Sequence, residues 1–341
     1  MDSERPNKYC ALRQRLWLLA VGCWVLAVGC ALVSCSWVRD DRDDCPEGFW
    51  LQLHYTYNIL DVEAAPEYVN DAFVYVYDDT GNYVKRIDVS HDVLTANDYK
   101  VRVDGLPEGD YQFVVWSGIG NSQYAVSGDM LTMADFRLSL AGAGGSSSDS
   151  QLVSLFHGYH PAVHYDDAYA LYDVELTKNT NQLACLVVSL SKDAVMSLDD
   201  YTMKVVAANS VMDARNELPQ VAATTYEPFE QDVVTIDDPD YGQLHGLRFN
   251  IMTLRLTTSR DSRIVFEKKS SGQTLFNISF PEYVGMIGSL YTTLGRPLSV
   301  QEYLDRQDLF TIVFYLSEDL DRLLQLSVNN WRLRANYHLK L

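Results

Sequence analysis

The chain has 341 residues and a formal net charge of −19, from 46 acidic against 27 basic side chains. So negative a protein repels phosphates, which argues against nucleic acid and against anionic lipid headgroups as direct partners. The length allows about two domains. The 22 tyrosines favour strands, because aromatic side chains suit a pleated, half-buried surface.

The N-terminal segment has the pattern of an export signal. Arg13 and Arg15 precede an unbroken apolar run over residues 16–33, which ends in Leu32-Val33-Ser34-Cys35. A basic flank, an apolar run and a small-residue cut site are typical of a secretory signal, so residues 1–34 are predicted to be a signal peptide. The alternative is a plain transmembrane anchor, because the run has about the minimum length that spans a bilayer.

The end of this run predicts a lipid attachment point. Leu32 lies three positions before Cys35 and the small Ser34 lies just before it, as lipoprotein processing requires. Cys30 is the rival site, although the residue three before it is only Ala27. We expect diacylglycerol and an N-acyl chain on Cys35 and no other cofactor. Two or three acyl chains hold a protein firmly in a membrane, whereas one binds reversibly.

Residues 35–48 are predicted to be an acidic stalk. The segment resembles the signal that directs lipoproteins of Bacteroidetes to the outer face of the outer membrane, so outer-membrane lipid is an expected partner and the cell surface the expected location. The aspartates that carry this resemblance are Asp40, Asp41, Asp43 and Asp44.

Two cysteines remain free after cleavage before Cys35 and attachment of lipid to it. In an oxidising compartment, Cys45 and Cys185 would be able to pair, which would tie the stalk to the second domain. The alternative is a buried Cys185 on an apolar strand together with a free or intermolecular Cys45.

Residues 49–167 alternate apolar and polar side chains with the period of two that is typical of strands. Asp78–Asn82 is a turn signal between two of these runs, and residues 104–109 join two more, so two hairpins are predicted. The predicted strands begin with the run that carries Leu51, Leu53, Tyr55 and Tyr57 and continue with Phe73–Tyr77, Tyr83–Val89, Lys100–Val103 and Tyr111–Trp116.

A flexible loop rich in glycine and serine is expected over residues 141–150, and a connector over residues 157–167.

A second sandwich is expected over residues 168–341, because many short strands with regular turn signals indicate β-sandwiches. The strands predicted for this second sandwich are Tyr172–Leu176, Leu183–Leu190, Thr202–Ala208, Leu247–Thr257, Arg263–Glu267, Thr274–Ser279 and Leu309–Leu316.

The last eleven residues alternate to Leu341. Such a strand either closes its own sheet or is donated to the sheet edge of a partner, where backbone hydrogen bonds supply affinity and alternate side chains fill pockets. The apolar face that would enter those pockets is Trp331, Leu333, Ala335, Tyr337, Leu339 and Leu341.

No catalytic or metal-binding pattern stands out. His157, His160 and His164 are close in sequence, but they lack the spacing of a metal site, and their role stays unassigned. The acidic stretch from Asp237 to Gly242 lacks the closing glutamate of a calcium loop and is interpreted as a polar turn. We therefore expect neither an enzyme nor a metal protein.

The motifs together resemble the fimbrial anchor lipoproteins of Bacteroidales type V pili, the family of minor fimbrium anchoring subunits. Each motif is weak alone, and their order over nearly the whole mature chain carries the resemblance. They are Asp43-Asp44-Cys45-Pro46, Tyr55-Thr56-Tyr57-Asn58, Val74-Tyr75-Val76-Tyr77-Asp78-Asp79-Thr80-Gly81, Leu106-Pro107-Glu108-Gly109-Asp110-Tyr111, Leu155-Phe156-His157-Gly158, Leu176-Thr177-Lys178-Asn179-Thr180-Asn181 and Val328-Asn329-Asn330-Trp331.

The resemblance implies an all-β protein with two transthyretin-like Greek-key β-sandwiches. It implies a subunit that holds the base of a pilus to the outer membrane and limits its growth, with a fimbrillin shaft subunit as partner. Strand exchange in such pili suggests that Trp331–Leu341 engages that pilin. The alternative function is a surface lipoprotein that binds glycan or a host ligand outside any pilus, because sandwiches often present exposed aromatic side chains.

Overall fold

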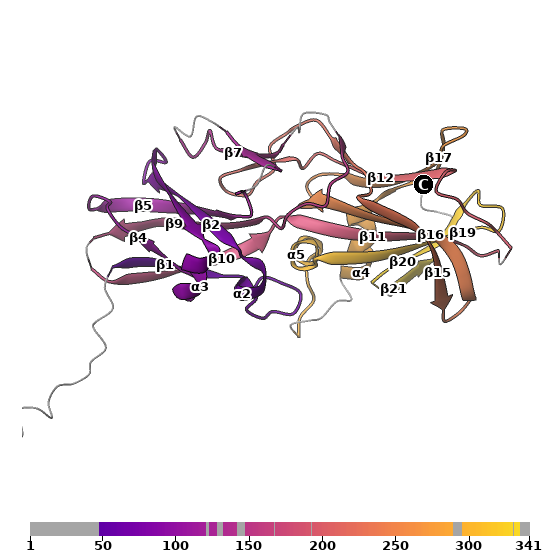
Figure 1. The fold of residues 1–341 in the computed structure, drawn as a ribbon, viewed down its shortest axis with the longest axis horizontal. Coiled ribbons are helices and arrows are strands. Elements are labelled where there is room, and N and C mark those ends of the chain that lie inside the picture. Colours follow the sequence, from indigo (N-terminus) through magenta and orange to yellow (C-terminus); the bar gives the residue numbers. More distant parts are fainter. Residues whose placement is uncertain are drawn as a thin grey trace, which may run out of the picture. The chain divides into compact units, whose positions relative to one another are not determined.

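The computed structural model describes residues 48–120, 123–127, 132–141, 147–166, 168–191, 193–288, 295–329 and 331–334. Residues 48–341 form one compact unit. The predicted signal peptide, with Cys30, and residues 35–47 of the predicted stalk, with Cys35 and Cys45, lie outside the described residues. The described part is built mainly of strands, so the all-β prediction is confirmed (Figure 1).

The strands of the first sandwich are hydrogen-bonded in the order β3-β2-β5-β9-β10-β1-β4, and they enclose a common core. The predicted alternation is visible in β1, where Phe49, Leu51 and Leu53 are buried and the residues between them are partly exposed. The strands are β1 (Phe49–His54), β2 (Asp71–Asp78), β3 (Tyr83–Ser90), β4 (Lys100–Val103), β5 (Gly109–Ser117), β9 (Phe156–Tyr165) and β10 (Ala170–Lys178).

The predicted β2–β3 hairpin is confirmed. The Asp78 carboxylate accepts hydrogen bonds from the backbone N–H groups of Thr80 and Asn82, at 3.0 and 2.8 Å. Gly81 has a φ of +86°, a conformation that costs little only without a Cβ atom. The sequence thus contains everything that this turn needs.

The second predicted hairpin is wrong. β4 pairs with β1, whereas β5 pairs with β2 and β9, so the two strands are not neighbours. The predicted connector over residues 157–167 is also wrong, because β9 occupies most of it and pairs with β5 along its length. In both cases the decisive hydrogen bonds join segments that are far apart in the sequence.

The predicted boundary at residue 168 falls inside the first sheet. β10 pairs in parallel with β1 and antiparallel with β9, so it belongs to the first sandwich rather than to the second. Only Asn179 separates β10 from β11 (Thr180–Ser189), which is the first long strand of the second sandwich. The chain therefore passes between the sandwiches without a flexible linker.

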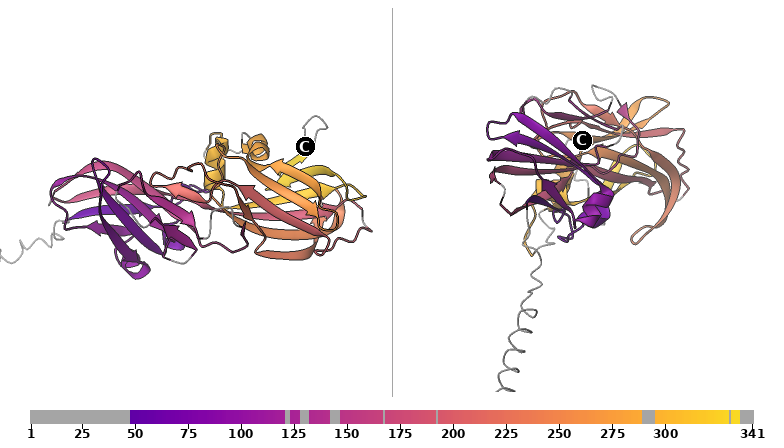
Figure 2. Two further views of the ribbon diagram at one scale, coloured as in Figure 1. Left: turned by 90° about the horizontal axis from the view of Figure 1, so that it is seen from above. Right: turned by 60° about the vertical axis from the view of Figure 1, so that its left-hand side comes forward.

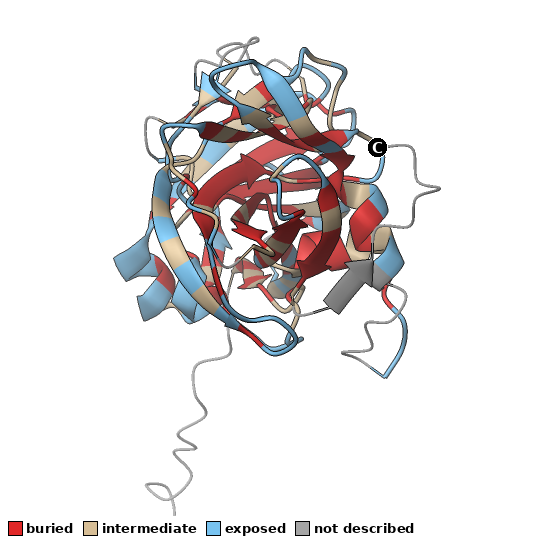
Figure 3. Cartoon of the chain, turned by 90° about the vertical axis from the view of Figure 1, so that its right-hand side faces the viewer, coloured by how far each residue is buried: buried red, intermediate tan, exposed pale blue. Residues whose placement is uncertain are grey.

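The second sandwich packs a six-stranded sheet, β15-β16-β11-β19-β20-β21, against a five-stranded sheet, β18-β17-β12-β14-β8 (Figure 2). Residues of both sheets belong to one core cluster. Figure 3 shows the buried residues in red along the strands. Apart from β11, the strands are β8 (Ser147–Ser148), β12 (Tyr201–Ala207), β14 (Thr224–Tyr226), β15 (Glu230–Asp238), β16 (Gly242–Leu254), β17 (Ser262–Lys268), β18 (Gln273–Ser279), β19 (Leu309–Leu316), β20 (Leu323–Val328) and β21 (Trp331–Arg334).

A small third sheet joins residues from both halves of the chain. β7 (Arg137–Leu140) pairs with β6 (Tyr124–Val126) and with β13 (Val211–Asp213). It contributes to the same core cluster as Trp116 of the first sandwich. The segment predicted as a flexible loop, residues 141–150, includes β8, which pairs with β14, while residues 142–146 lie outside the described part. The helices are α2 (Ala65–Tyr68), α3 (His91–Ala96), α4 (Phe280–Gly288) and α5 (Val300–Arg306).

Candidate anchoring and subunit-binding sites

The predicted lipidation sites, Cys35 and Cys30, lie outside the described residues, which begin at Gly48. Gly48 leads directly into β1, and a Cβ atom at this position would lie 3.5 Å from Nε of Arg102 on β4. No helix within the described ranges is long and apolar enough to cross a membrane. A tether that precedes Gly48 would therefore join the first sandwich at the start of β1.

Cys185 is a fully buried thiol on β11. It lies beside Phe249 of β16 and Ile312 of β19 in the pairing register, and burial raises the pKa of its thiol. This placement matches the alternative of a structural cysteine inside the core. Cys45 lies outside the described residues, so the disulfide between Cys45 and Cys185 stays a prediction.

The terminal strand begins inside the protein's own sheet. Residues Trp331–Arg334 form β21, which pairs antiparallel with β20 at the edge of the six-stranded sheet. Asn329, with a φ of +48°, makes the turn between them, and its side-chain oxygen accepts a hydrogen bond from the Thr311 N–H at 2.8 Å. Trp331 and Leu333 are therefore in a strand of this chain. The other predicted binding residues, Ala335, Tyr337, Leu339 and Leu341, lie outside the described residues.

The three histidines share β9 without forming a site. His157 is buried against Trp116, with ring centroids 4.6 Å apart, and its Nε2 donates to the Ala214 carbonyl at 2.9 Å. His160 packs on Tyr172, and the exposed His164 bonds to an aspartate of β5. No metal-capable group of three His, Cys, Asp or Glu side chains occurs within the described ranges.

His157 should make the stability of the fold depend on pH. Burial lowers its pKa to about 4, against the opposing effect of its bond to Ala214. An unfolded histidine has a pKa near 6.5, so the folded protein binds fewer protons between these values. The contribution of the neutral His157 to the free energy of unfolding is therefore fully present above pH 6.5 and is lost as the pH falls towards 4. Wild-type protein should lose about 2 kcal/mol through this group between pH 7.5 and 5. His157→Gln should lack that part of the pH dependence in urea unfolding, and an identical pH slope in both proteins would refute the assignment.

A buried ion pair holds α5 against the end of β16. Nε and Nη2 of Arg255 donate to the two oxygens of Asp305, each at 2.8 Å, and Nη1 donates to the Asn216 carbonyl at 3.1 Å. Gln301 also donates to Asp305, at 2.8 Å. The Asp305 side chain is only 4% exposed. Charged groups this deeply buried are stable only when they are paired and hydrogen-bonded, as these are.

The last residue of α5 reaches the first sandwich. The Arg306 guanidinium stacks over the Tyr57 ring at 4.3 Å from its centroid and donates to the Asn58 carbonyl at 3.0 Å and to Asp61 at 3.2 Å. The ammonium of Lys178, at the end of β10, pairs with Asp308 just before β19. These contacts fix the second sandwich to the loop that follows β1 and to the end of β10.

The turn between β15 and β16 is a polar turn, as interpreted from the sequence. The Asp238 carboxylate accepts hydrogen bonds from the Asp240 and Tyr241 N–H groups and from the Tyr315 hydroxyl, at 2.9, 3.1 and 2.7 Å. These bonds occupy the carboxylate with protein donors.

The sequence matches the model of a known family over most of its length. The family model of fimbrillin-A associated anchor proteins Mfa1 and Mfa2 matches residues 42–337. The chain belongs to this family of fimbrial anchor proteins. The resemblance inferred from the motifs is thereby confirmed, and the family is one of structural anchors rather than of enzymes. No curated protein matches the chain.

Solved structures of similar proteins cover nearly the whole anchor fold. A protein of Bacteroides thetaiotaomicron with a provisional description as polysaccharide-binding is 25% identical, with a TM-score of 0.72 over 85% of this chain and 98% of that one. A second protein of the same organism, with a provisional description as an adhesin, is 23% identical, with a TM-score of 0.74 over 87% of this chain and 100% of that one. The fimbrial anchor protein Mfa2 of Porphyromonas gingivalis is 16% identical, with a TM-score of 0.64 over 86% and 100%.

Membership of the anchor family supports a pilus-associated or adhesive role at the cell surface. Arg306, which reaches the first sandwich, and the Arg255–Asp305 pair, which holds its helix in the second, were not foreseen from the sequence. The available signal was weak, because it consisted only of charged side chains next to apolar ones at the end of a strand and in a short helix.

Proposed function

We propose that this chain is the lipid-anchored base subunit of a fimbria. Lipid on Cys35 anchors the chain in the outer membrane, the acidic residues after it form the stalk, and the first sandwich begins at Gly48. The neighbouring pilin binds at the second sandwich and cannot elongate past the anchored subunit. Family membership supports the pilus-associated part of this proposal.

The observation that carries the pilin-binding part is the position of β21. This strand lies at the edge of the six-stranded sheet and pairs with β20 on one side. The apolar alternation of Trp331 and Leu333 continues in the sequence through Ala335 to Leu341. We infer that residues 335–341 extend the strand into the sheet of the pilin, where backbone bonds supply affinity and alternate side chains fill pockets.

Deletion of the gene should release pili into the medium and lengthen them, because nothing then holds the base or ends growth. Wild-type chain should restore short, cell-bound pili, whereas a chain that ends at Arg334 should not. That truncation keeps β21, so its unfolding free energy should stay within about 0.5 kcal/mol of wild type. The control is a chain that ends at Asn330, which also exposes β20 and should be less stable.

Unchanged pili after gene deletion would refute the anchor function and favour a surface lipoprotein that binds glycan or a host ligand. Short, retained pili with the chain that ends at Arg334 would refute only the role of residues 335–341.

A further inference from the structure

Residues 56–64, in the loop between β1 and α2, present two apolar side chains to solvent. Leu60 is 73% exposed and Val62 is 52% exposed. Single exposed apolar residues are common on proteins and need no explanation. Two that lie two positions apart, on a loop held as firmly as this one, are a different case, and we call residues 56–64 the tip loop.

The Asn58 side chain organises the tip loop from inside. Its Nδ2 donates to the carbonyls of Tyr55 and Val62, at 2.9 and 2.6 Å, and its Oδ1 accepts from the Leu60 N–H at 3.1 Å. The Asp61 N–H donates to the Asn58 carbonyl at 3.1 Å. Asp61 has a φ of +54°, a conformation that is costly for a residue with a Cβ atom and that persists only where the surroundings enforce it.

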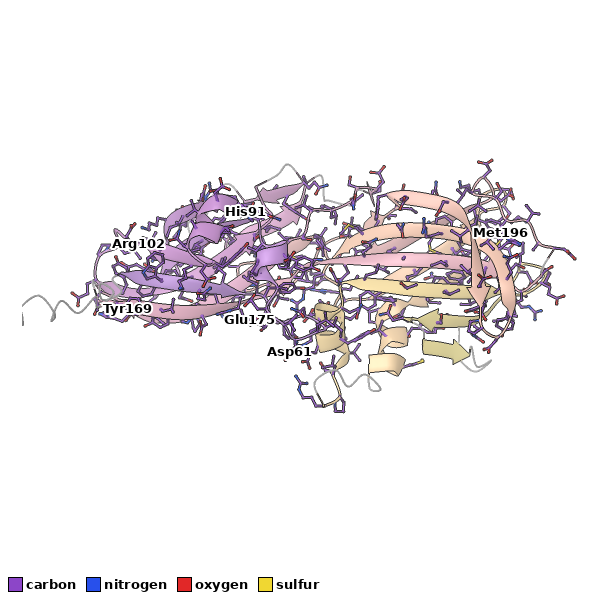
Figure 4. All side chains as sticks on the ribbon, turned by 60° about the horizontal axis from the view of Figure 1, so that its bottom comes forward. Asp61, His91, Arg102, Tyr169, Glu175 and Met196 are labelled. Carbon is purple, nitrogen blue, oxygen red and sulfur yellow. The ribbon has the colours of Figure 1, made fainter. Side chains whose placement is uncertain are left out.

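Two carboxylates, one on β10 and one in the loop itself, hold the backbone at the ends of the loop. Glu175 of β10 accepts from the N–H groups of Thr56 and Tyr57, at 2.7 and 2.9 Å. Glu63 accepts from the N–H groups of Tyr55 and Ala65, at 3.0 and 2.8 Å. Figure 4 shows Asp61 and Glu175 on the same side of the described fold. The two chain segments that enter and leave the tip are therefore fixed to the first sandwich.

The second sandwich fixes the same loop through Arg306. Its guanidinium stacks on Tyr57 and donates to the Asn58 carbonyl and the Asp61 carboxylate. The tip thus has contacts from both sandwiches although Leu60 and Val62 contact mainly solvent. A preordered loop loses little conformational entropy on binding, so its apolar contacts contribute more of their free energy to affinity.

We propose that the tip loop docks into an apolar pocket with a basic rim on the neighbouring fimbrial subunit. This inference rests on the proposed function and adds a second contact to the terminal strand. The rim of the tip carries four carboxylates, of Asp61, Glu63, Glu175 and Glu302. Two arginines offset part of this charge, since Arg306 pairs with Asp61 and Glu302 and Arg296 pairs with Glu302, while His54 bonds to Glu63. Such a rim selects a cationic partner surface.

A membrane surface fits the tip loop poorly. The acidic rim would be repelled by anionic headgroups. The tether is attached at Gly48, at the start of β1, whereas the tip loop follows the end of that strand, so a six-residue strand of roughly 20 Å separates them. A protein partner at the side away from the tether satisfies both observations.

A photo-crosslinker at position 60 of the full chain in cells tests the partner directly. With p-benzoylphenylalanine in place of Leu60, we expect a crosslink to a fimbrial subunit, identified by mass spectrometry. The matched control is position 195, because Val195 is 89% exposed but lies in the second sandwich on a turn that makes no part of the tip. A crosslink from position 60 to a second copy of this chain or to lipopolysaccharide, or no crosslink, would overturn the proposal.

A double variant tests the energetic role. Leu60→Asp with Val62→Asp should weaken binding of the purified chain to the fimbrial subunit about tenfold or more, whereas Val195→Asp should not. Both variants should keep the wild-type melting temperature, since all three side chains face solvent. If gene deletion releases pili but the double variant binds the subunit as wild type does, only the tip-loop proposal is wrong. If gene deletion leaves pili unchanged, the proposed function itself is wrong.

Discussion

Asp305→Ala is expected to destabilise the protein by about 3 kcal/mol, because it removes the buried carboxylate that pairs with Arg255, whose own side chain is 18% exposed. The lost bonds are the two 2.8 Å contacts from Arg255 and the 2.8 Å contact from Gln301. Arg255 keeps only the Asn216 carbonyl among its contacts described above. Urea unfolding of the chain without its signal peptide measures the loss.

The fold supplies a matched control with the same geometry at the surface. Arg248 of β16 donates to both oxygens of Asp232 of β15, each at 2.8 Å, but these side chains are 39% and 41% exposed. Water and salt screen such a pair, so Asp232→Ala should cost about 1 kcal/mol or less. Equal losses in the two variants would show that the Arg255–Asp305 pair between β16 and α5 contributes no more than an ordinary surface contact.

Combining the two substitutions Arg255→Met and Asp305→Leu separates charge from packing. Replacing both partners of a buried ion pair with apolar residues is often nearly neutral, whereas removing one partner is costly. The double variant should therefore be more stable than Asp305→Ala. This outcome would identify the unpaired charge, rather than the lost volume, as the cause of the instability.

Local signals in the sequence were sufficient for the strands and for one turn. The buried positions Phe49, Leu51 and Leu53 follow the period of two, and Asp78 and Gly81 supply the turn chemistry between β2 and β3. These features depend on neighbours in sequence. For that reason most predicted strands exist in the structure with shifts of a few residues.

The sequence did not show which distant strands pair with each other. β10 has the alternation of a strand in either sandwich, and only its bonds to β1, more than a hundred residues earlier, assign it to the first. β9 contains Pro161 and three histidines, which made it resemble a connector, yet β5 pairs with it throughout. Strand pairing of this kind is a property of the whole fold.

For the candidate sites, too, local motifs could be read from the sequence, whereas contacts between distant residues could not. The family could be inferred from short motifs spread over the chain, and the family model confirms it. Arg306 could not be assigned a role, because its partners Asn58 and Asp61 lie about 250 residues away in sequence. Asn58 belongs to the motif Tyr55-Thr56-Tyr57-Asn58. The structure shows what its side chain does there, because its hydrogen bonds hold the tip loop.

Cys35→Ala should abolish anchoring while it leaves the folded unit intact. Each methylene in a bilayer contributes about 0.8 kcal/mol, so two or three acyl chains supply nearly all of the membrane affinity proposed here. The compact unit begins at residue 48, well after the cysteine, so the substitution should not affect its stability. Cys30→Ala is the control, because it removes the rival cysteine and should retain both the lipid and the anchoring.

The measurement that tests the central claim most directly is the fraction of pili that remain with the cells when the gene is replaced by its Cys35→Ala variant. We predict that most pili appear in the medium with the unlipidated subunit at their base, whereas cells with wild-type chain or with Cys30→Ala retain theirs. Pili that stay on cells carrying the Cys35→Ala variant, in the same proportion as on wild-type cells, would contradict the account.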